Sequence, residues 1–232
     1  ESYDYTVAWI DSLAKGSEIG RGVFKRANHS LSASLSQSKP KRMSIPINPP
    51  FSLVNKSSLK IFNFLYQWNS SRKKGRNSEN IIPFFYPLDS IRNWNNIYGQ
   101  KGFLQYQCVI PMKNAKRVIR EILERISISQ QGSFLAVLKV FGNIESPGML
   151  SFPRPGVTLA LDFPNKGDKL FKLLYELDQI VISSEGAIYP AKDARMSSET
   201  FCASFPELKE FSTFIDPIFS SSFWRRVGGD QV

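Results

Sequence analysis

The chain has one histidine and two cysteines, and this scarcity excludes several kinds of site. A transition-metal site needs several nitrogen or sulfur ligands at a recognisable spacing, and His29, Cys108 and Cys202 show no such spacing. Two cysteines are also too few for a disulfide framework. Cys108 lies in a strand-like run, which predicts a small buried side chain. A serine-protease triad is disfavoured because His29 lies in a serine-rich, loop-like region.

Long apolar runs are also missing, since the sequence contains no stretch of about 18 consecutive apolar residues and no transmembrane helix is expected. No signal-peptide pattern precedes the first strand-like run. The chain begins with Glu1 instead of Met, so we expect a piece of a longer polypeptide, located in the cytoplasm or peripheral to the inner membrane. At 42% hydrophobic and 22% charged residues, the composition is typical of a globular domain.

The formal net charge is +10, from 30 Lys and Arg against 20 Asp and Glu. Such an excess is compatible with a nucleic acid, an anionic membrane, a phosphorylated substrate or simply a solvated basic surface. The basic residues are dispersed, except in the run from Ser71 to Arg76, which is typical of a turn. Charge alone therefore leaves the partner open.

The first 80 residues divide into two segments of different composition. Residues 1–29 carry strand-like runs at Tyr3–Ile10 and Arg21–Arg26. Residues 30–80 are rich in Ser, Pro, Asn and Lys, and predict a mostly irregular segment with a short apolar piece at Leu59–Trp68. A loop of this length is either functional or flexible.

Residues 101–190 have the most regular hydrophobic pattern. Alternation predicts strands at Phe103–Pro111, Phe134–Phe141, Val157–Phe163 and Ala187–Tyr189. Helical spacing predicts one helix from Asn114, and a second from Asp168 as N-cap to a stop at Gly186. The order is the β-α-β-β-α-β of a ferredoxin-like unit. We therefore expect an α+β fold, with an antiparallel sheet, helices on one face and the other face free to cover a ligand.

Polar residues interrupt three of these strands. Gln105 and Gln107 share one face of their strand, Lys139 interrupts an apolar strand, and Thr158 and Ala160 alternate with apolar neighbours. If all five point away from the helices, they form a polar surface with one cation, suited to a sugar or a phosphate. An exposed polar face and an edge-strand lysine are the alternatives.

Two further segments carry candidate residues. In the aromatic run from Phe84 to Tyr86, the rings could stack on a sugar or a flavin, or could be core. The segment from Ile188 to Arg195 places Tyr, Lys, Asp and Arg close together after the second helix. Lys192 in this segment could act in a site, or could form a surface ion pair with Asp193 or Glu199.

Many short motifs, in order along the chain, resemble one family. The similar stretches are Tyr5–Asp11, Phe85–Asp89, Gly102–Gln107, Ser151–Gly156, Asp162–Pro164 and Ala191–Asp193. They are similar to the decaprenylphosphoryl-β-D-ribose 2′-oxidase family, which are FAD-dependent oxidoreductases of the vanillyl-alcohol-oxidase class. The resemblance extends from about residue 3 to about residue 226 and is weakest over residues 30–80.

The resemblance implies that the chain contains parts of two domains. Residues 1–186 would be the substrate-binding domain, and residues 187–232 would complete a FAD-binding domain whose N-terminal part is absent here. We therefore expect FAD in the full-length protein and none in this chain alone. Lys192 would be the catalytic residue beside flavin and substrate, with Tyr189 and Ala191 also at the cofactor.

The resemblance also implies a substrate pocket. Its residues would be Gln105, Gln107, Lys139, Phe85, Tyr86, Thr158 and Ala160. Phe85, Thr158 and Ala160 stand where the family pattern has Tyr, Asn and Cys, so the pocket differs in detail.

The implied function is oxidation of a secondary alcohol on a sugar, in cell-wall biosynthesis. The expected partners are a sugar or polyprenyl-phospho-sugar substrate, the missing FAD domain and a membrane surface by peripheral association, with no nucleic acid. A related FAD-linked oxidase acting on a small sugar, lactone or hydroxy acid is one alternative. An RNA or anionic-ligand binding module is another, although the RNP1 motif of RNA-recognition domains is missing from the strands.

Overall fold

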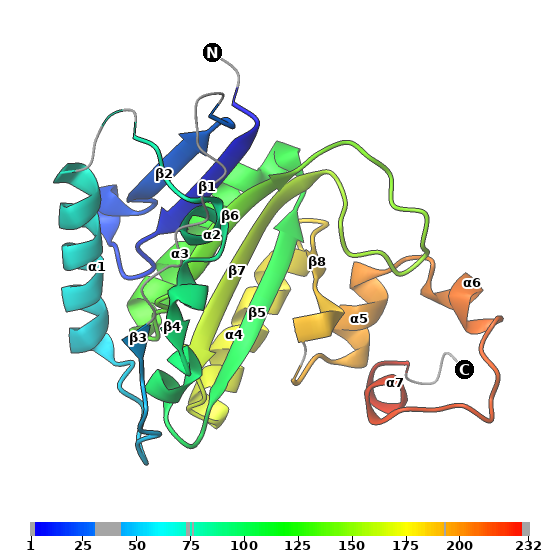
Figure 1. The fold of residues 1–232 in the computed structure, drawn as a ribbon. Helices are drawn as coiled ribbons and strands as arrows, with labels where there is room; N and C mark the ends of the chain where they lie inside the picture. The colour runs from blue at the N-terminus through cyan, green and yellow to red at the C-terminus, as the bar shows by residue number, and fades with distance from the viewer. Residues whose placement is uncertain (1–2, 31–42, 73–74, 76, 193, 229–232) are drawn as a thin grey trace.

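A six-stranded antiparallel sheet forms the centre of the molecule (Figure 1). The computed structural model describes residues 3–30, 43–72, 75, 77–192 and 194–228. The spatial order of the strands is β2-β1-β6-β7-β5-β8. Their bounds are β1 Tyr5–Ile10, β2 Gly22–Ala27, β5 Phe103–Ile110, β6 Ala136–Phe141, β7 Gly156–Pro164 and β8 Ala187–Ile188.

The predicted ferredoxin-like unit is confirmed. Helix α3 (Met112–Ser129) follows β5, and helix α4 (Asp168–Ile182) follows β7, which gives the expected alternation of elements. Within the unit the strands lie in the order β6-β7-β5-β8, and β1 and β2 extend the sheet beyond β6. The strands of residues 1–29 therefore share one sheet with the later unit.

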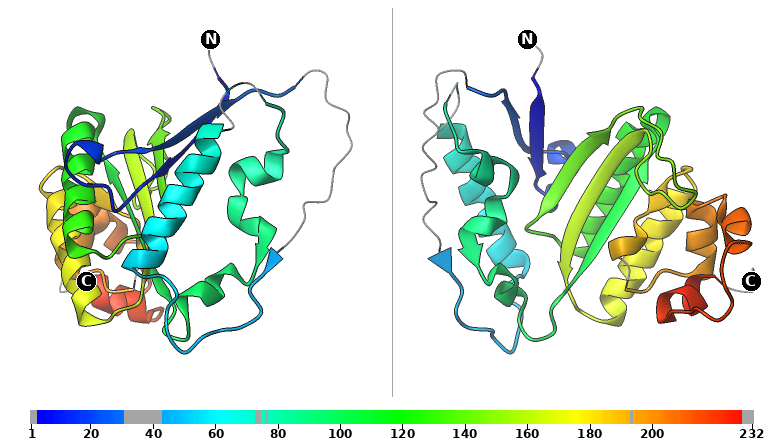
Figure 2. Two further views of the ribbon diagram at one scale, coloured as in Figure 1. Left: turned by 90° about the vertical axis from the view of Figure 1, so that its left-hand side faces the viewer. Right: turned by 45° about the vertical axis from the view of Figure 1, so that its right-hand side comes forward.

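Helices α3 and α4 cover one face of the sheet (Figure 2). On β5 this face carries Leu104, Tyr106, Cys108 and Ile110, which alternate with the residues of the opposite face. The apolar stripes of both helices pack onto it. The resulting core includes Val118, Ile122, Ile126, Leu159, Leu161, Leu170, Leu174 and Leu177, each at most 2% exposed.

The described residues cover the opposite face of the sheet only in part. Helix α1 (Lys56–Arg72) packs over its β1 side, where Trp9 contacts Phe62 and Tyr66. The 3-10 helix η3 (Trp94–Tyr98) covers one end of β5, and the ring of Tyr98 stacks on Phe103. Between these covers lies the stretch of β5 and β7 that carries the polar residues.

The described residues 43–72 are more ordered than the composition of residues 30–80 predicts. The expectation of a mostly irregular segment is wrong for α1, which spans 17 residues instead of the short apolar piece at Leu59–Trp68. Leu59 and Asn63 anchor the helix, and the Asn63 amide donates a hydrogen bond to Asp11 at 2.6 Å. Residues 31–42 lie outside the described part.

Short elements complete the region before β5. Two of them, β3 (Met43–Ser44) and β4 (Ile91–Arg92), form a small parallel pair. The others are η1 (Gly16–Glu18), α2 (Ile81–Phe85) and η2 (Pro87–Ser90).

The two ends of α4 differ from the sequence prediction. Asp168 is the first helical residue instead of the N-cap, which is Gly167. At the other end the left-handed residue is Glu185, and Gly186 has a different role. A Cβ atom at Gly186 would lie 2.7 Å from the Val109 carbonyl oxygen, so this glycine permits close approach to β5.

The segment after β8 packs onto the same core. It consists of η4 (Pro190–Lys192), α5 (Ser198–Ser204), α6 (Leu208–Ser212) and α7 (Ser222–Val227). Phe201, Phe205 and Leu208 are buried in the cluster that α3 and α4 share with the sheet. No described helix is long and apolar enough to cross a membrane.

Candidate functional site

The strand register brings the predicted polar residues onto one face. Gln107 lies opposite Ala160 on β7, and Lys139 on β6 lies opposite Thr158. Residues directly opposite in an antiparallel sheet point to the same side. Gln105 is two residues from Gln107 and points the same way. All five predicted residues therefore share the face away from α3 and α4, and we call this part of the sheet the polar face.

The amide group of each glutamine has a fixed partner. The Gln107 Nε2 atom donates to Thr158 Oγ1 at 3.1 Å, and the Gln105 Nε2 atom donates to Asp162 Oδ1 at 3.0 Å. A carboxylate only accepts hydrogen bonds, so Asp162 orients the Gln105 amide. The Gln105 carbonyl oxygen is then left as an acceptor for a hydroxyl group of a ligand.

Asp162 is the site residue that the sequence interpretation missed. Its side chain is 2% exposed, and its Oδ2 atom has no hydrogen-bond partner among the described residues. Burial raises the pKa of Asp162 to about 6, against the opposing effects of the Gln105 hydrogen bond and the positive charge of Lys192. The alternation of Thr158, Ala160 and Asp162 already placed this carboxylate on the polar face.

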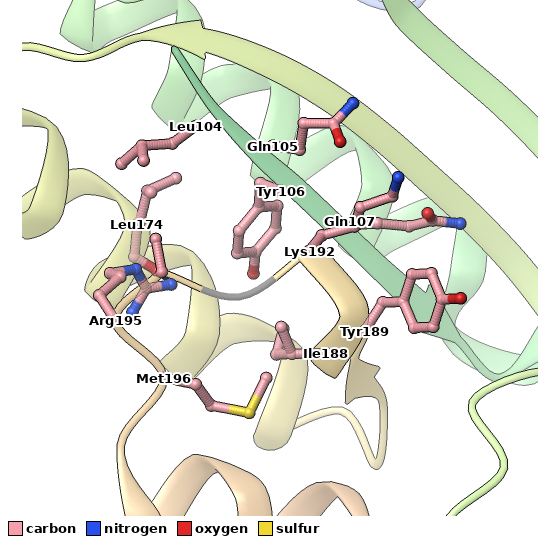
Figure 3. Close-up of a pocket in the computed structure, with 11 residues that line it drawn as sticks. Leu104, Gln105, Tyr106, Gln107, Leu174, Ile188, Tyr189, Lys192, Arg195 and Met196 are labelled. Carbon is pink, nitrogen blue, oxygen red and sulfur yellow. Dashed lines mark hydrogen bonds between the residues drawn. The ribbon is translucent and has the colours of Figure 1, made fainter. Parts of the chain in front are cut away.

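Lys192 lies beside the two glutamines (Figure 3). Its side chain extends from η4 across β5, and its positive charge opposes the burial that raises the pKa of Asp162. Together with Gln105, Gln107 and Tyr189, it lines a small pocket at the edge of β5. The arrangement combines a cation, two amides and a carboxylate, which are the groups that orient a polyol.

Arg195 holds this segment against α4. Its guanidinium group forms two hydrogen bonds with the carboxylate of Asp178, at 2.6 and 2.9 Å, and Asp178 is 1% exposed. Paired N–H donors on one carboxylate fix both position and direction. The ion pair thus anchors the chain just after Lys192, whereas the neighbouring Asp193 lies outside the described residues.

The two other predicted cofactor residues have different surroundings. The Tyr189 ring stacks on Phe152, with centroids 4.5 Å apart and an interplanar angle of 24°. Its backbone N–H donates to the Gln107 carbonyl at 2.8 Å, which extends the pairing of β8 with β5. Ala191 is exposed on η4. Tyr189 is therefore rigidly held beside the glutamines.

Phe85 and Tyr86 are not brought to the glutamines. Phe85 ends α2 and packs edge-to-face on Tyr5 of β1, at a centroid distance of 5.3 Å. Two strands, β6 and β7, separate β1 from β5 in the sheet. Tyr86 is 60% exposed. A role for either ring at the substrate would need a ligand long enough to cross the sheet.

The cysteines and the histidine have no place in this site. Cys108 is fully buried, which confirms it as a core residue, and this burial raises the pKa of its thiol to about 12. His29 contacts the Tyr5 hydroxyl. The described residues contain no cluster of three or more potential metal ligands.

The described residues could contact a flavin from one side only. The pocket beside Lys192 has a volume of about 20 Å³, enough for about one water molecule and far too small for an isoalloxazine ring. The ammonium group of Lys192 is a donor that fits the carbonyl oxygens and ring nitrogens at the edge of a flavin, whereas the backbone N–H groups of Tyr189 and Lys192 already bond to Gln107 and Tyr189. A flavin would therefore need a second protein surface to enclose it.

The chain is similar in sequence to a known oxidase. The chain is 34% identical, over an alignment of 241 positions, to decaprenylphosphoryl-β-D-ribose oxidase of Mycolicibacterium smegmatis. The alignment covers 97% of the chain and 51% of that oxidase. This similarity confirms the family resemblance of the sequence motifs.

A second relative is more distant. A Streptomyces coelicolor protein, described as an uncharacterized protein in the mprA 5′ region, is 27% identical over 97% of the chain and 66% of its own length. No family model matches the chain. The chain thus spans between half and two thirds of the length of these curated relatives.

Proposed function

We propose that this chain is the substrate-binding part of a FAD-dependent oxidoreductase that oxidises a secondary alcohol of a lipid-linked phospho-sugar. The observation that carries the proposal is the polar face of β5 and β7, with Lys192 at its edge, in a chain similar to an oxidase of such a substrate. The rest of the polypeptide would supply the remaining wall of the flavin site.

The chain's own residues have separate tasks in this proposal. Gln105, oriented by Asp162, accepts a hydrogen bond from a sugar hydroxyl, and Gln107 acts in the same way beside Thr158. Lys139, on the same face, neutralises the phosphate of the substrate. Flavin, when bound, would accept the hydride of the alcohol carbon, and the hydroxyl proton would be released to solvent. Lys192 stabilises the negative charge that accumulates beside it.

The test is Lys192→Ala in the full-length protein, with Lys172→Ala on the exposed side of α4 as the control. We expect flavin content to be retained and flavin reduction by substrate, measured in a single turnover, to fall by roughly 10²- to 10³-fold. An unchanged reduction rate for Lys192→Ala would refute the catalytic role of this lysine.

The choice of substrate separates the main alternative. A lipid-linked phospho-sugar and the corresponding free sugar are compared as reductants of the flavin in the full-length protein. Faster reduction by the free sugar would favour an oxidase of small sugars, lactones or hydroxy acids. Lys139→Gln should weaken binding of the phosphorylated substrate and leave that of the free sugar unchanged.

A further inference from the structure

Helix α1 carries an apolar stripe that no described part of the chain covers. Ile61, Phe64, Leu65 and Trp68 are each between 51% and 67% exposed. Their spacing of three and four residues puts them on one side of the helix, opposite the buried Leu59 and Asn63. The left view of Figure 2 looks onto this helix. We call these four residues the α1 stripe.

The α1 stripe lies in an acid-free part of the chain. Residues 19–78 contain twelve Lys and Arg and no Asp or Glu, whereas the rest of the chain contains eighteen against twenty. The whole positive excess therefore lies in the segment that contains α1. At the end of the stripe, the Arg72 guanidinium lies over the Trp68 ring, 4.6 Å from its centroid. Trp and Arg side by side are common where a protein meets a membrane interface.

A basic pocket lies at the base of the same helix. It has a volume of about 350 Å³ and is lined by Lys15, Lys56 and Lys60, with Glu18 as its one acidic residue among the described residues. No described carboxylate forms an ion pair with these three lysines. Arg21 also lines the pocket, but it is already paired with Asp11 and Glu18. The three lysines are therefore available to an anion.

We propose that the α1 stripe and the basic pocket together form a docking surface for a bilayer of anionic lipids. The stripe enters the interface between headgroups and acyl chains, and Lys56 and Lys60, from the same helix, contact lipid phosphates. A second copy of the chain is a poorer occupant, because it would bring two basic segments together. The inference extends the proposed function, since a lipid-linked substrate is held in a bilayer, but lipid binding is measured without turnover.

The first experiment is flotation of the full-length protein with vesicles. Vesicles of phosphatidylcholine alone are compared with an equal mixture of phosphatidylcholine and phosphatidylglycerol. We expect binding to the mixed vesicles, weakened by added salt, and little binding to the neutral ones. Blue-shifted tryptophan fluorescence on binding, lost in Trp68→Phe, would place the stripe in the lipid.

Matched variants distinguish binding through this surface from nonspecific adsorption to the vesicles. Phe64→Ser combined with Leu65→Ser should weaken partition into mixed vesicles by about tenfold or more. Lys56→Gln and Lys60→Gln should each weaken it by about fivefold. The controls remove exposed groups elsewhere, namely the more exposed pair Ile144→Ser with Ile218→Ser, and Lys116→Gln with Lys172→Gln. Circular dichroism verifies that every variant is folded.

Three results would overturn the inference. The first is no binding of the full-length protein to either vesicle, which would mean that another part of the polypeptide covers the stripe. The second is equal binding by the stripe variants and their controls. The third is a change in the oligomeric state of the stripe variants without a change in lipid binding, which would assign the surface to a second copy. Flavin reduction by a soluble substrate analogue would be unaffected by these variants, so the proposed function is tested separately.

Discussion

The buried carboxylate of Asp162 lowers the stability of the folded protein, and the variant Asp162→Asn measures by how much. The carboxylate is buried, with one oxygen accepting from Gln105 and the other without a partner among the described residues. Burial raises its pKa from 3.8 to about 6. Because an upward shift means that the folded state holds the proton more tightly, the charged form is the destabilised one.

The direction of the pH dependence follows from proton linkage. Below the pKa of Asp162 in the unfolded state, the folded and unfolded states are both protonated, and the ionisation of Asp162 does not affect stability. As the pH rises through the window from about 4 to about 6, the unfolded state loses its proton first, so stability falls. Above about pH 6 the penalty is complete and, at 1.36 kcal/mol per pH unit, amounts to about 3 kcal/mol.

The amide of Asp162→Asn cannot ionise, so the variant avoids this pH-dependent penalty. The free energy of unfolding of variant and wild type is measured by urea denaturation between pH 4 and pH 8. We expect the difference between them to move in favour of the variant by about 2 to 3 kcal/mol across this range, since part of the penalty is already present at pH 4. A constant offset from the new amide leaves this change unaffected. Asp216→Asn, which removes an exposed carboxylate, is the control.

Two outcomes would refute the reasoning. A difference that stays flat with pH would mean that Asp162 is not destabilised by ionisation. A difference that moves toward the wild type at high pH would mean that Lys192 and Gln105 overcompensate for burial. In that case Asp162 would be one half of a stabilising pair.

Two further predictions concern the elements that hold the site. Arg195→Met leaves the carboxylate of Asp178 buried without its ion-pair partner and should cost about 3 to 5 kcal/mol in urea denaturation; Arg117→Met, which removes an exposed pair, should cost less than about 1 kcal/mol. Gly186→Ala places a Cβ atom 2.7 Å from the Val109 carbonyl and should lower stability by about 1 to 3 kcal/mol. Gly142→Ala, where a Cβ atom meets nothing within 4 Å, should be close to neutral, and a loss as large as that of Gly186→Ala would contradict the steric explanation.

The regular part of the fold could be predicted because its periodicity is strong. The alternation in β5 and the helical spacing in α3 define which side of each element is buried. The same periodicity predicted the shared face of Gln105 and Thr158, since a one-residue shift would have put their apolar neighbours in solvent. Here local pattern and tertiary packing agree.

Helix α1 could not be predicted in the same way. Its outward side is apolar and its buried side includes Asn63, so the usual contrast between the two sides is weak. What orders it are contacts distant in sequence, with Asp11 and with Trp9. Sequence windows do not contain such contacts, and the surrounding Ser, Asn and Lys favoured an irregular segment.

Asp162 was overlooked for a different reason. A single Asp at the end of an apolar strand is usually an exposed turn residue. Only the register, which puts it opposite Gln105 and close to Lys192, shows that it is buried. The role of a buried carboxylate depends on its neighbours across the sheet, and these are far away in the chain.

The cost of Asp162 is itself an argument that the polar face binds something. A buried carboxylate with an unpartnered oxygen lowers stability, and an apolar residue at the same place would extend the core. Groups of this kind are concentrated at functional sites, where a ligand completes their hydrogen bonds. Asp162 Oδ2 is closed to solvent in this structure, so a ligand hydroxyl could donate to it only if the neighbouring side chains moved; such a bond would stabilise the charged form and lower the pKa of this carboxylate. Lys192, anchored through the Arg195–Asp178 pair, lies where it would strengthen that effect.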